Sequence, residues 1–335
     1  MSVLVTGGAG YIGSHVTNAL VDQGETVVVL DNLSTGDLSL VDQRAIFVKG
    51  DVLDHELLCM LLRDHDVNSV LHFAGSVVVP ESVQKPLWYY RNNVIGSQTL
   101  INACVHNNVR NFIFSSTAAV YGVTETGVVS EESAKAPISP YGRSKLMTEW
   151  MLADTAAAHD FRYTILRYFN VAGADPLGRT GQSTPKATHL IKKACRVALS
   201  LEPYLEIFGS DFPTRDGTGV RDYIHVADLA HAHLLSLNAL RQGKPSEIFN
   251  CGYGNGFSVR EVISAVERVG GTKLEIRETG RRPGDPATLV ANPAKILKEL
   301  GWESRYSAID VIVSSALKWE KKLLRRDREM KGPPS

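Results

Sequence analysis

A cluster of glycines near the N-terminus constrains the fold of this chain more than any other feature. The apolar run Val3 to Val5 predicts a strand, and an apolar helical pattern begins at about Gly13. Glycines between them let the backbone approach an anion closely, while the helix N-terminus offers free N–H groups. This strand–loop–helix order is typical of a pyrophosphate site. The residues expected to contact a dinucleotide here are Gly7, Gly10, Tyr11, Ile12 and Gly13.

An acidic residue follows the next apolar run and indicates which dinucleotide binds. The run Thr26 to Leu30 predicts a second strand, and Asp31 comes directly after it, eighteen residues beyond Gly13. A carboxylate at this place hydrogen-bonds the adenosine ribose and repels a 2′-phosphate. The sequence therefore predicts NAD rather than NADP, with Asn32 beside the same ribose.

Composition and charge exclude several classes of protein. The 36 basic residues balance the 36 acidic ones, so bulk charge indicates neither nucleic acid nor an anionic membrane as a partner. No apolar run has the length of a membrane span, and a strand beginning at residue 3 leaves no room for a signal peptide. The four cysteines are scattered, without the spacing of a metal or redox site. We therefore expect a cytoplasmic protein with no metal.

Apolar β-type runs recur along the first half of the chain with helix-compatible segments between them. This alternation predicts a Rossmann-type α/β fold, in which a doubly wound parallel sheet is covered by helices on both faces. We expect this NAD-binding domain to cover residues 1–172, with a late return around 225–252, and a smaller mixed α/β substrate domain to cover 173–335. The runs are Val3–Val5, Thr26–Leu30, Ala45–Val48, Val70–Phe73, Phe112–Phe114, Tyr163–Leu166 and the late Ile248–Asn250.

A tyrosine and a lysine four residues apart supply the candidate chemistry. Tyr141 and Lys145 share one face of a helix predicted to open at Ser139. An ammonium group beside a phenol favours the phenolate, so we expect a lowered pKa and a general base at Tyr141. Ser115, Ser116 and Thr117 directly follow the predicted strand Phe112–Phe114. At this end of the strand the Thr117 hydroxyl could position a sugar oxygen. We expect Ser115, just before it, to cap the strand end beside the cofactor.

The glycine loop, Asp31, the Ser115 to Thr117 segment and Tyr-x-x-x-Lys together resemble the extended short-chain dehydrogenases/reductases. Within that family, longer segments resemble the UDP-glucose 4-epimerases over residues 2 to about 320. The most specific of them is the run from Gly217 to Tyr223. The resemblance implies NAD as cofactor, a UDP-sugar as substrate, reversible epimerisation at C4 through a 4-keto sugar, and a homodimer formed through helices around 92–107 and 141–159.

The resemblance also implies a role for individual residues. It places Asp51 and Val52 beside the adenine, and surrounds the nicotinamide half with Phe73, Ala74, Asn92, Lys145, Tyr168 and Phe169. Around the UDP-sugar it places Thr117, Tyr141, Asn170, His189, Leu190, Phe208, Arg221, Tyr223, Arg282, Asp285 and Leu289. Planar guanidinium groups suit a diphosphate, because each can donate two hydrogen bonds. Val77 departs from relatives that carry a lysine near the cofactor.

Two other functions stay open at this point. A 4,6-dehydratase or a UDP-uronate epimerase would share the fold, but a dehydratase typically places Asp-Glu after the catalytic hydroxyl, where this chain has Ala118 and Ala119. A non-catalytic NAD-binding sensor would not need Tyr141 and Lys145. Four aspartates in the second half fit loop solvation and helix capping: Asp211, Asp216, Asp222 and Asp228.

Overall fold

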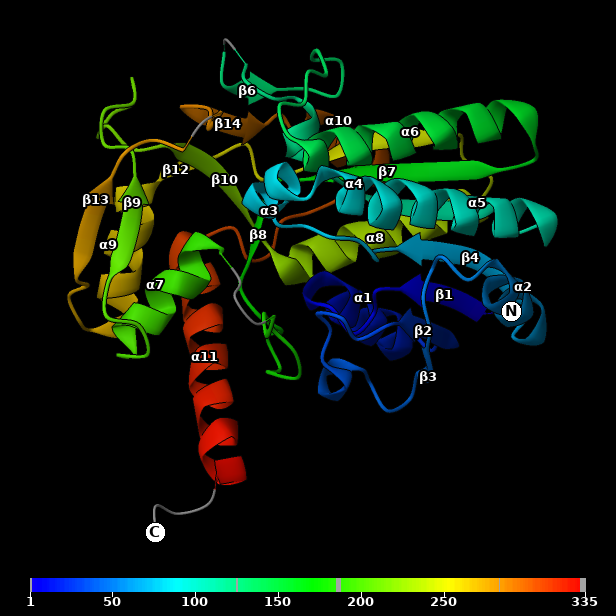
Figure 1. Ribbon diagram of the computed structural model, residues 1–335, viewed down its shortest axis with the longest axis horizontal. Helices are drawn as coiled ribbons and strands as arrows, with labels where there is room; N and C mark the ends of the chain where they lie inside the picture. Colours follow the sequence, from blue (N-terminus) through cyan, green and yellow to red (C-terminus); the bar gives the residue numbers. More distant parts are fainter. Residues whose placement is uncertain (1, 125, 185–187, 283, 332–335) are drawn as a thin grey trace.

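A parallel sheet of seven strands organises the first half of the chain, in a computed structural model that describes residues 2–124, 126–184, 188–282 and 284–331. The sheet confirms the predicted doubly wound arrangement (Figure 1). In spatial order its strands are β11 (Glu247–Cys251), β7 (Arg162–Tyr168), β5 (Asn111–Thr117), β4 (Val67–His72), β1 (Ser2–Thr6), β2 (Val27–Asp31) and β3 (Ile46–Lys49).

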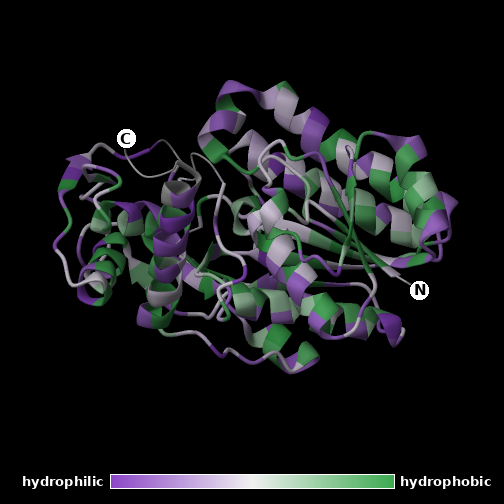
Figure 2. Ribbon diagram, turned by 90° about the horizontal axis from the view of Figure 1, so that it is seen from below, coloured by the Kyte–Doolittle hydropathy of each residue, from purple (hydrophilic) through white to green (hydrophobic). Residues whose placement is uncertain are grey.

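Apolar side chains alternate between the two faces of this sheet because successive residues of a strand point in opposite directions. Val3 and Val5 of β1 enter one buried cluster, and Leu4 enters the other. Helices α1 (Tyr11–Asp22) and α8 (Val226–Arg241) cover the first face. The second face is covered by α2 (His55–Asp64), α5 (Gly96–His106) and α6 (Pro140–Ala158). Figure 2 shows the hydrophobic strands running between helices whose outer faces are hydrophilic.

The late strand predicted around Ile248 returns the chain to the first sheet. Strand β11 pairs in parallel with β7 at the edge of the sheet, with Ile248 opposite Ile165. Before it, α8 packs against α1 on the same face. Residues distant in sequence therefore complete the seven-stranded sheet.

A second, smaller sheet lies beside the carboxyl ends of the first. Its strands are β12 (Gly256–Ser258), β10 (Val220–His225), β14 (Thr288–Ala291) and β6 (Val128–Val129), and β8 (Asn170–Ala172) pairs with the far end of β10. A separate pair joins β9 (Leu205–Phe208) to β13 (Ile276–Thr279). Strand β6 comes from the first half of the chain, so the two sheets are not built from two consecutive halves.

Three helices form the core of the second region. Apolar side chains of α7 (Leu190–Ala198), α9 (Val259–Gly270) and α11 (Ile309–Lys331) meet in one buried cluster. Helix α9 begins with a capping box, in which Ser258 and Glu261 bond each other's backbone N–H groups. The remaining short helices are η1 (Leu38–Leu40), α3 (Val79–Gln84), α4 (Pro86–Tyr89), the π-helix η2 (Tyr90–Ile95), η3 (Ala118–Val120) and α10 (Ala294–Leu300). Within the described ranges, every helix is too short or too polar to span a bilayer.

Candidate functional site

The glycine loop has the shape that a pyrophosphate needs. Gly7 has a φ of +73°, and a Cβ added there would lie 2.6 Å from the backbone nitrogen of Ala74. At Gly13 an added Cβ would lie 2.3 Å from the carbonyl oxygen of Gly7, so only glycine lets α1 approach the strand this closely. Gly10 caps α1 without a side-chain hydrogen bond, which leaves the N–H groups at the helix start available to an anion. The loop therefore fits a dinucleotide.

Asp31 stabilises this loop from the end of β2. Its buried carboxylate accepts hydrogen bonds from the backbone N–H groups of Ala9, at 3.0 Å, and Leu33, at 2.8 Å. Burial raises the pKa of Asp31, and these two bonds oppose the rise. Next to it the Asn32 amide donates to Asp51 at 2.9 Å, and Val52 is buried. The predicted ribose and adenine residues thus lie together at one end of the sheet.

Lys145 reaches the carboxyl end of β5 from α6. Ser139 caps α6 by accepting a hydrogen bond from Gly142 N–H, which fixes the first turn that carries Tyr141. The Lys145 ammonium donates to the Ser115 carbonyl at 2.9 Å and lies 4.8 Å from the centre of the Phe114 ring. Burial lowers the pKa of Lys145 to about 8. The predicted helix and the predicted strand end therefore meet at this lysine.

Tyr141 and Thr117 face each other at the same sheet edge. Burial raises the pKa of Tyr141, and a hydrogen bond with the Thr117 hydroxyl opposes the rise. The expectation of a lowered tyrosine pKa is therefore wrong for the chain's own groups, because burial outweighs the hydrogen bond with Thr117. Thr117 also accepts a hydrogen bond from Ala119 N–H, so strand-end capping and proximity to Tyr141 coexist.

The residues expected around the nicotinamide lie close together but make contacts that the sequence did not predict. The Tyr168 hydroxyl lies 2.5 Å from His233 Nε2, and the Phe73 ring is centred 4.9 Å from the same imidazole. Burial lowers the pKa of His233 to about 4, so this histidine is neutral at physiological pH. Phe169 is buried in a separate apolar cluster, with Ala118 and Tyr121.

Asn92 and Asn93 both bind Ser76, and the role of Asn93 was not predicted from the sequence. Asn92 donates to the Ser76 hydroxyl at 2.9 Å. Asn93 accepts from Ser76 N–H at 2.8 Å and donates to the Ser144 hydroxyl at 3.0 Å, joining the segment after β4 to α6. The adjacent residues Asn92 and Asn93 were the sequence signal for these contacts, because neighbouring amides on one helical turn point to different partners.

The predicted sugar-nucleotide residues gather on the second region. Arg221 lies 3.9 Å from the Asp285 carboxylate, and the Arg282 guanidinium stacks 3.6 Å from the centre of the Phe208 ring. Burial lowers the pKa of Arg221. Leu289 pairs in register with Arg221 and packs beside the Phe169 cluster. Pro283, between Arg282 and Asp285, lies outside the described residues.

A pocket joins the two regions. Its walls come from the start of α1, from strand β8 and the residues after it, and from α7 and α11. They include the predicted residues Tyr11, Asn170, His189, Leu190 and Tyr223. The Tyr11 hydroxyl donates to the Gly173 carbonyl at 2.7 Å, so the first residue of α1 contacts the beginning of the second region. This pocket brings one predicted cofactor residue, Tyr11, together with four of the predicted substrate residues.

The structure corrects the sequence interpretation of two aspartates in the second region. Asp222 and Asp228 are buried rather than solvated. Asp222 accepts hydrogen bonds from the backbone N–H groups of Tyr253 and Gly254, at 2.9 and 2.8 Å. Asp228 accepts from the Tyr253 hydroxyl at 2.5 Å. Asp222 thus ties the loop after β11 to the second sheet, and Asp228 ties the same loop to α8. No group of three metal-ligating side chains suited to an ion occurs in the described ranges.

A buried ion pair behind the site was also missed. Arg167 of β7 binds Glu149 of α6 through both oxygens, at 3.0 and 2.6 Å, and Ser116 donates to the same carboxylate at 2.5 Å. The pair fixes α6 against the strand end that carries Thr117. A charged residue inside the apolar run of β7 was the signal, because a buried arginine needs a partner.

Comparison with known proteins identifies the class that this fold and site define. The chain belongs to the NAD dependent epimerase/dehydratase family, whose sequence model matches residues 3–252. Among curated proteins, it is 56% identical to the UDP-glucose 4-epimerase of Azospirillum brasilense over 96% of this chain and 92% of that protein.

Solved structures agree with this assignment. The UDP-glucose 4-epimerase of Brucella ovis in complex with NAD superposes with a TM-score of 0.92 at 44% identity, over 95% of this chain and 98% of that one. The UDP-Glc/GlcNAc 4-epimerase of Campylobacter jejuni is also 44% identical, with a TM-score of 0.84 over 96% and 99% of the two chains. The predicted fold and NAD dependence are confirmed.

Proposed function

We propose that this protein interconverts UDP-glucose and UDP-galactose by reversible epimerisation at C4. The observation that carries the proposal is the meeting of Tyr141, Thr117 and Lys145 at one strand end beside the glycine loop. The names of its relatives support the substrate, since proteins 44% to 56% identical over nearly the whole chain are UDP-glucose 4-epimerases.

The proposed division of labour follows the two regions. Bound NAD supplies a hydride acceptor and donor at the sugar C4. Gly7, Gly10, Tyr11, Ile12 and Gly13 hold its pyrophosphate, and Asp31 and Asn32 hold its ribose. These residues belong to the proposed NAD-binding domain, residues 1–172 with a return around 225–252, and the proposed substrate domain covers the remainder of 173–335.

Tyr141 acts as the general base and acid. Thr117 orients the C4 hydroxyl toward the phenolate, which removes the hydroxyl proton and, after the sugar has turned, returns it to the C4 oxygen. Because burial alone raises the pKa of Tyr141, the base form needs positive charge nearby. Lys145, one turn after Tyr141 on α6, is a candidate, and its pKa of about 8 leaves it largely protonated at pH 7.

The nucleotide and the hexose are held differently. Arg221 and Arg282 meet the diphosphate, and Phe208 and Asp285 support them from behind. With the UDP fixed, the 4-keto hexose can turn about its bond to the diphosphate and present its second face. Few charged groups would then hold the hexose itself, which the turn requires.

The direct test is to incubate the protein with UDP-galactose and follow the products. We expect UDP-glucose to accumulate to an equilibrium mixture without net release of NADH. A stoichiometric yield of NADH with an oxidised sugar would indicate a dehydrogenase. A dehydrated 4-keto-6-deoxy sugar would indicate a dehydratase, and no turnover with NAD bound would indicate a sensor.

We also propose that the protein works as a homodimer in the cytoplasm. Large apolar side chains are exposed along α4, η2 and α6, including Trp88, Ile95 and Trp150. A second copy of the chain would cover this surface through the helices around 92–107 and 141–159. The four cysteines are buried and free, which suits a reducing compartment. Trp150→Glu should halve the mass measured by sedimentation, and an unchanged mass would contradict this interface.

A further inference from the structure

The last helix, α11, contacts both sides of the site described above. Its first turns pack against α7 and α9, and Figure 1 shows its later turns running beyond them. At its middle, Glu320 accepts from the Lys192 ammonium of α7 at 2.5 Å, and both side chains are nearly buried. Helix α7 starts at Leu190, directly after His189. The substrate side of the pocket is therefore fixed to α11.

The later turns of α11 contact a segment that follows the cofactor residues Asp31 and Asn32. The Arg326 guanidinium donates to the Ser39 hydroxyl at 2.8 Å and to the Asp37 carboxylate at 3.2 Å. Leu40 packs with Trp319 and Leu323 in a small apolar cluster, where Leu40 and Trp319 are each 5% exposed. Polar and apolar contacts thus join α11 to residues 37–40.

This segment in turn lies against the glycine loop. The Asp37 N–H donates to the Ala9 carbonyl at 3.0 Å. A Cβ added to Gly36 would lie 2.9 Å from the Ala9 Cβ and 3.1 Å from an oxygen of Asp31. Residues 36–40 therefore cover the glycine loop and the Asp31 carboxylate, which hold the dinucleotide. Helix α11 packs against the outer side of these residues.

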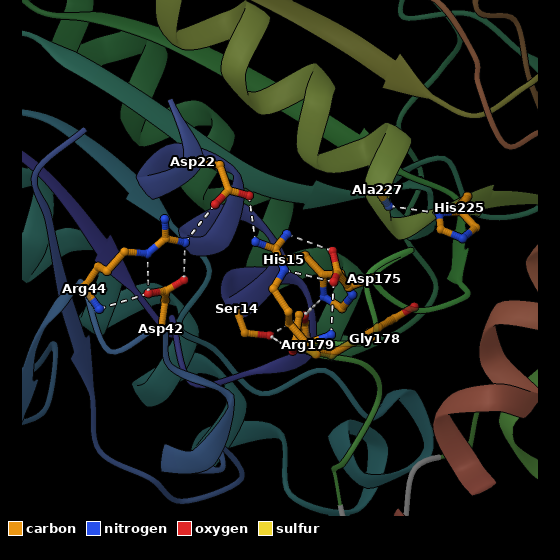
Figure 3. Close-up of polar contacts among 12 residues, drawn as sticks. Ser14, His15, Asp22, Asp42, Arg44, Asp175, Gly178, Arg179, His225 and Ala227 are labelled. Atoms are coloured by element: carbon orange, nitrogen blue, oxygen red, sulfur yellow. Dashed lines mark hydrogen bonds and ion pairs between the residues drawn. The ribbon is translucent and has the colours of Figure 1, made fainter. Parts of the chain in front are cut away.

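A second set of contacts holds α11 to the same end of the sheet. Lys322 donates to the Gly178 carbonyl at 2.8 Å, and Trp319 lies so close to Gly181 that a Cβ there would be 2.4 Å from its ring. Figure 3 shows how this stretch is anchored to α1: Arg179 binds both Asp175 and Asp22. The helix is therefore attached to the cofactor-binding region directly through residues 37–40 and indirectly through the stretch that Arg179 anchors to Asp22 of α1.

We propose that α11 is a clasp that retains the bound dinucleotide, with Leu323 and Arg326 as positioning residues that keep residues 37–40 closed over the glycine loop. For the dinucleotide to leave, this segment must separate from the glycine loop, and the contacts with α11 oppose that separation. A cofactor that is regenerated in every turnover need not be released. The proposal rests on the NAD dependence of the family and on no particular sugar.

The test is the rate at which the full-length protein releases NADH. Protein loaded with NADH is mixed with excess NAD, and the decay of bound NADH fluorescence gives the dissociation rate without any sugar present. We expect Leu323→Ala to raise this rate about tenfold. Arg326→Ala should raise it about threefold, because an ion pair this exposed contributes modestly. Arg325→Ala, an exposed neighbour on the same helix, is the control and should stay within 1.5-fold, roughly the effect of a surface substitution.

Two further variants separate a clasp from a general loss of stability. Asp37→Asn keeps an oxygen to cap Ser39 N–H but removes the charge that Arg326 binds. It should raise the rate as Arg326→Ala does, and the double variant should add little. Arg326→Lys should restore part of the retention. Unchanged release from Leu323→Ala and Arg326→Ala, or equal acceleration by Arg325→Ala, would overturn the proposal. Epimerisation of UDP-galactose by the unchanged protein is scored separately, so the two proposals can fail independently.

Discussion

The two sheets of this molecule reach stability by different routes. The seven-stranded sheet uses strands of four to seven residues whose apolar side chains, outside the edge strand β3, are mostly buried on both faces. The second sheet uses strands of two to six residues and buries Asp222 within its longest one. The first is held mainly by regular packing and the second by a few specific hydrogen bonds. A polar substitution at Asp222 should therefore weaken the second sheet, and a catalytic substitution should act in the first region.

The largest expected effect belongs to the cofactor-side chemistry. Tyr141→Phe should lower kcat for UDP-galactose by about 100-fold or more, because it removes the proton acceptor and donor. Binding of NAD and UDP, followed by calorimetry, should change little. Tyr204→Phe, in the second region beside Arg277, serves as the matched control. Near-normal turnover by Tyr141→Phe would remove the tyrosine from the mechanism.

The next effect tests the polar support of the second sheet. Asp222→Asn presents an amide N–H₂ to backbone N–H groups that now donate to a carboxylate. We expect it to lower the free energy of unfolding by about 2 kcal/mol, as for other buried groups left without a partner. Urea unfolding measures this loss. Asp211→Asn, whose side chain is 74% exposed, should cost less than about 0.5 kcal/mol. Equal costs would show that the buried Asp222 carboxylate does not stabilise the second sheet.

A third prediction concerns the cost of burying Lys145. Its pKa falls from the ordinary 10.5 to about 8, so between these values the unfolded chain binds more protons than the folded one. The free energy of unfolding should therefore rise between about pH 8 and 10.5. Below pH 8 the buried ammonium should lower it by a constant amount. Lys145→Met should stabilise the protein by about 1 to 2 kcal/mol at pH 7, after loss of the bond to Ser115.

The pH profile distinguishes this explanation from simple repacking. The advantage of Lys145→Met should shrink as the pH rises through 10.5, because above this pH the lysine becomes neutral in both states. Thermal unfolding of both proteins across this range measures the difference. The variant should also bind NAD more weakly. An advantage that stays constant with pH would show that the ammonium charge is not its source.

The smallest expected effect concerns sugar selectivity. We propose that Leu289 lines the hexose, where it is shorter than a tyrosine would be and leaves room for an acetamido group. We therefore expect measurable epimerisation of UDP-N-acetylglucosamine, slower than that of UDP-glucose. The Campylobacter jejuni relative is named for both sugars. Leu289→Tyr should lower the relative rate on the acetamido sugar about fivefold, with Leu289→Met as the control, since one added contact is worth roughly 1 kcal/mol. Equal losses on both sugars would reject a selective role.

The sequence predicted the first region well because its signals are local. Val3 to Val5 and Thr26 to Leu30 are apolar over the whole strand, and only a doubly covered parallel sheet buries such runs. The Tyr141–Lys145 spacing likewise needed only a helix. The second region depends on contacts distant in sequence, such as Asp222 with Tyr253 and Lys192 with Glu320, which no local pattern reveals. The predicted lowering of the Tyr141 pKa was wrong for the same reason, since burial is a property of the folded chain.

The most direct test of the account is the fate of the hydrogen on the sugar C4. UDP-galactose carrying deuterium at C4 is converted in ordinary water, and the UDP-glucose formed is examined by mass spectrometry and NMR. If the hydrogen leaves as a hydride and returns to the same sugar, while Tyr141 moves only the hydroxyl proton, the product should retain deuterium at C4. Replacement of that deuterium by hydrogen from the solvent would contradict the account.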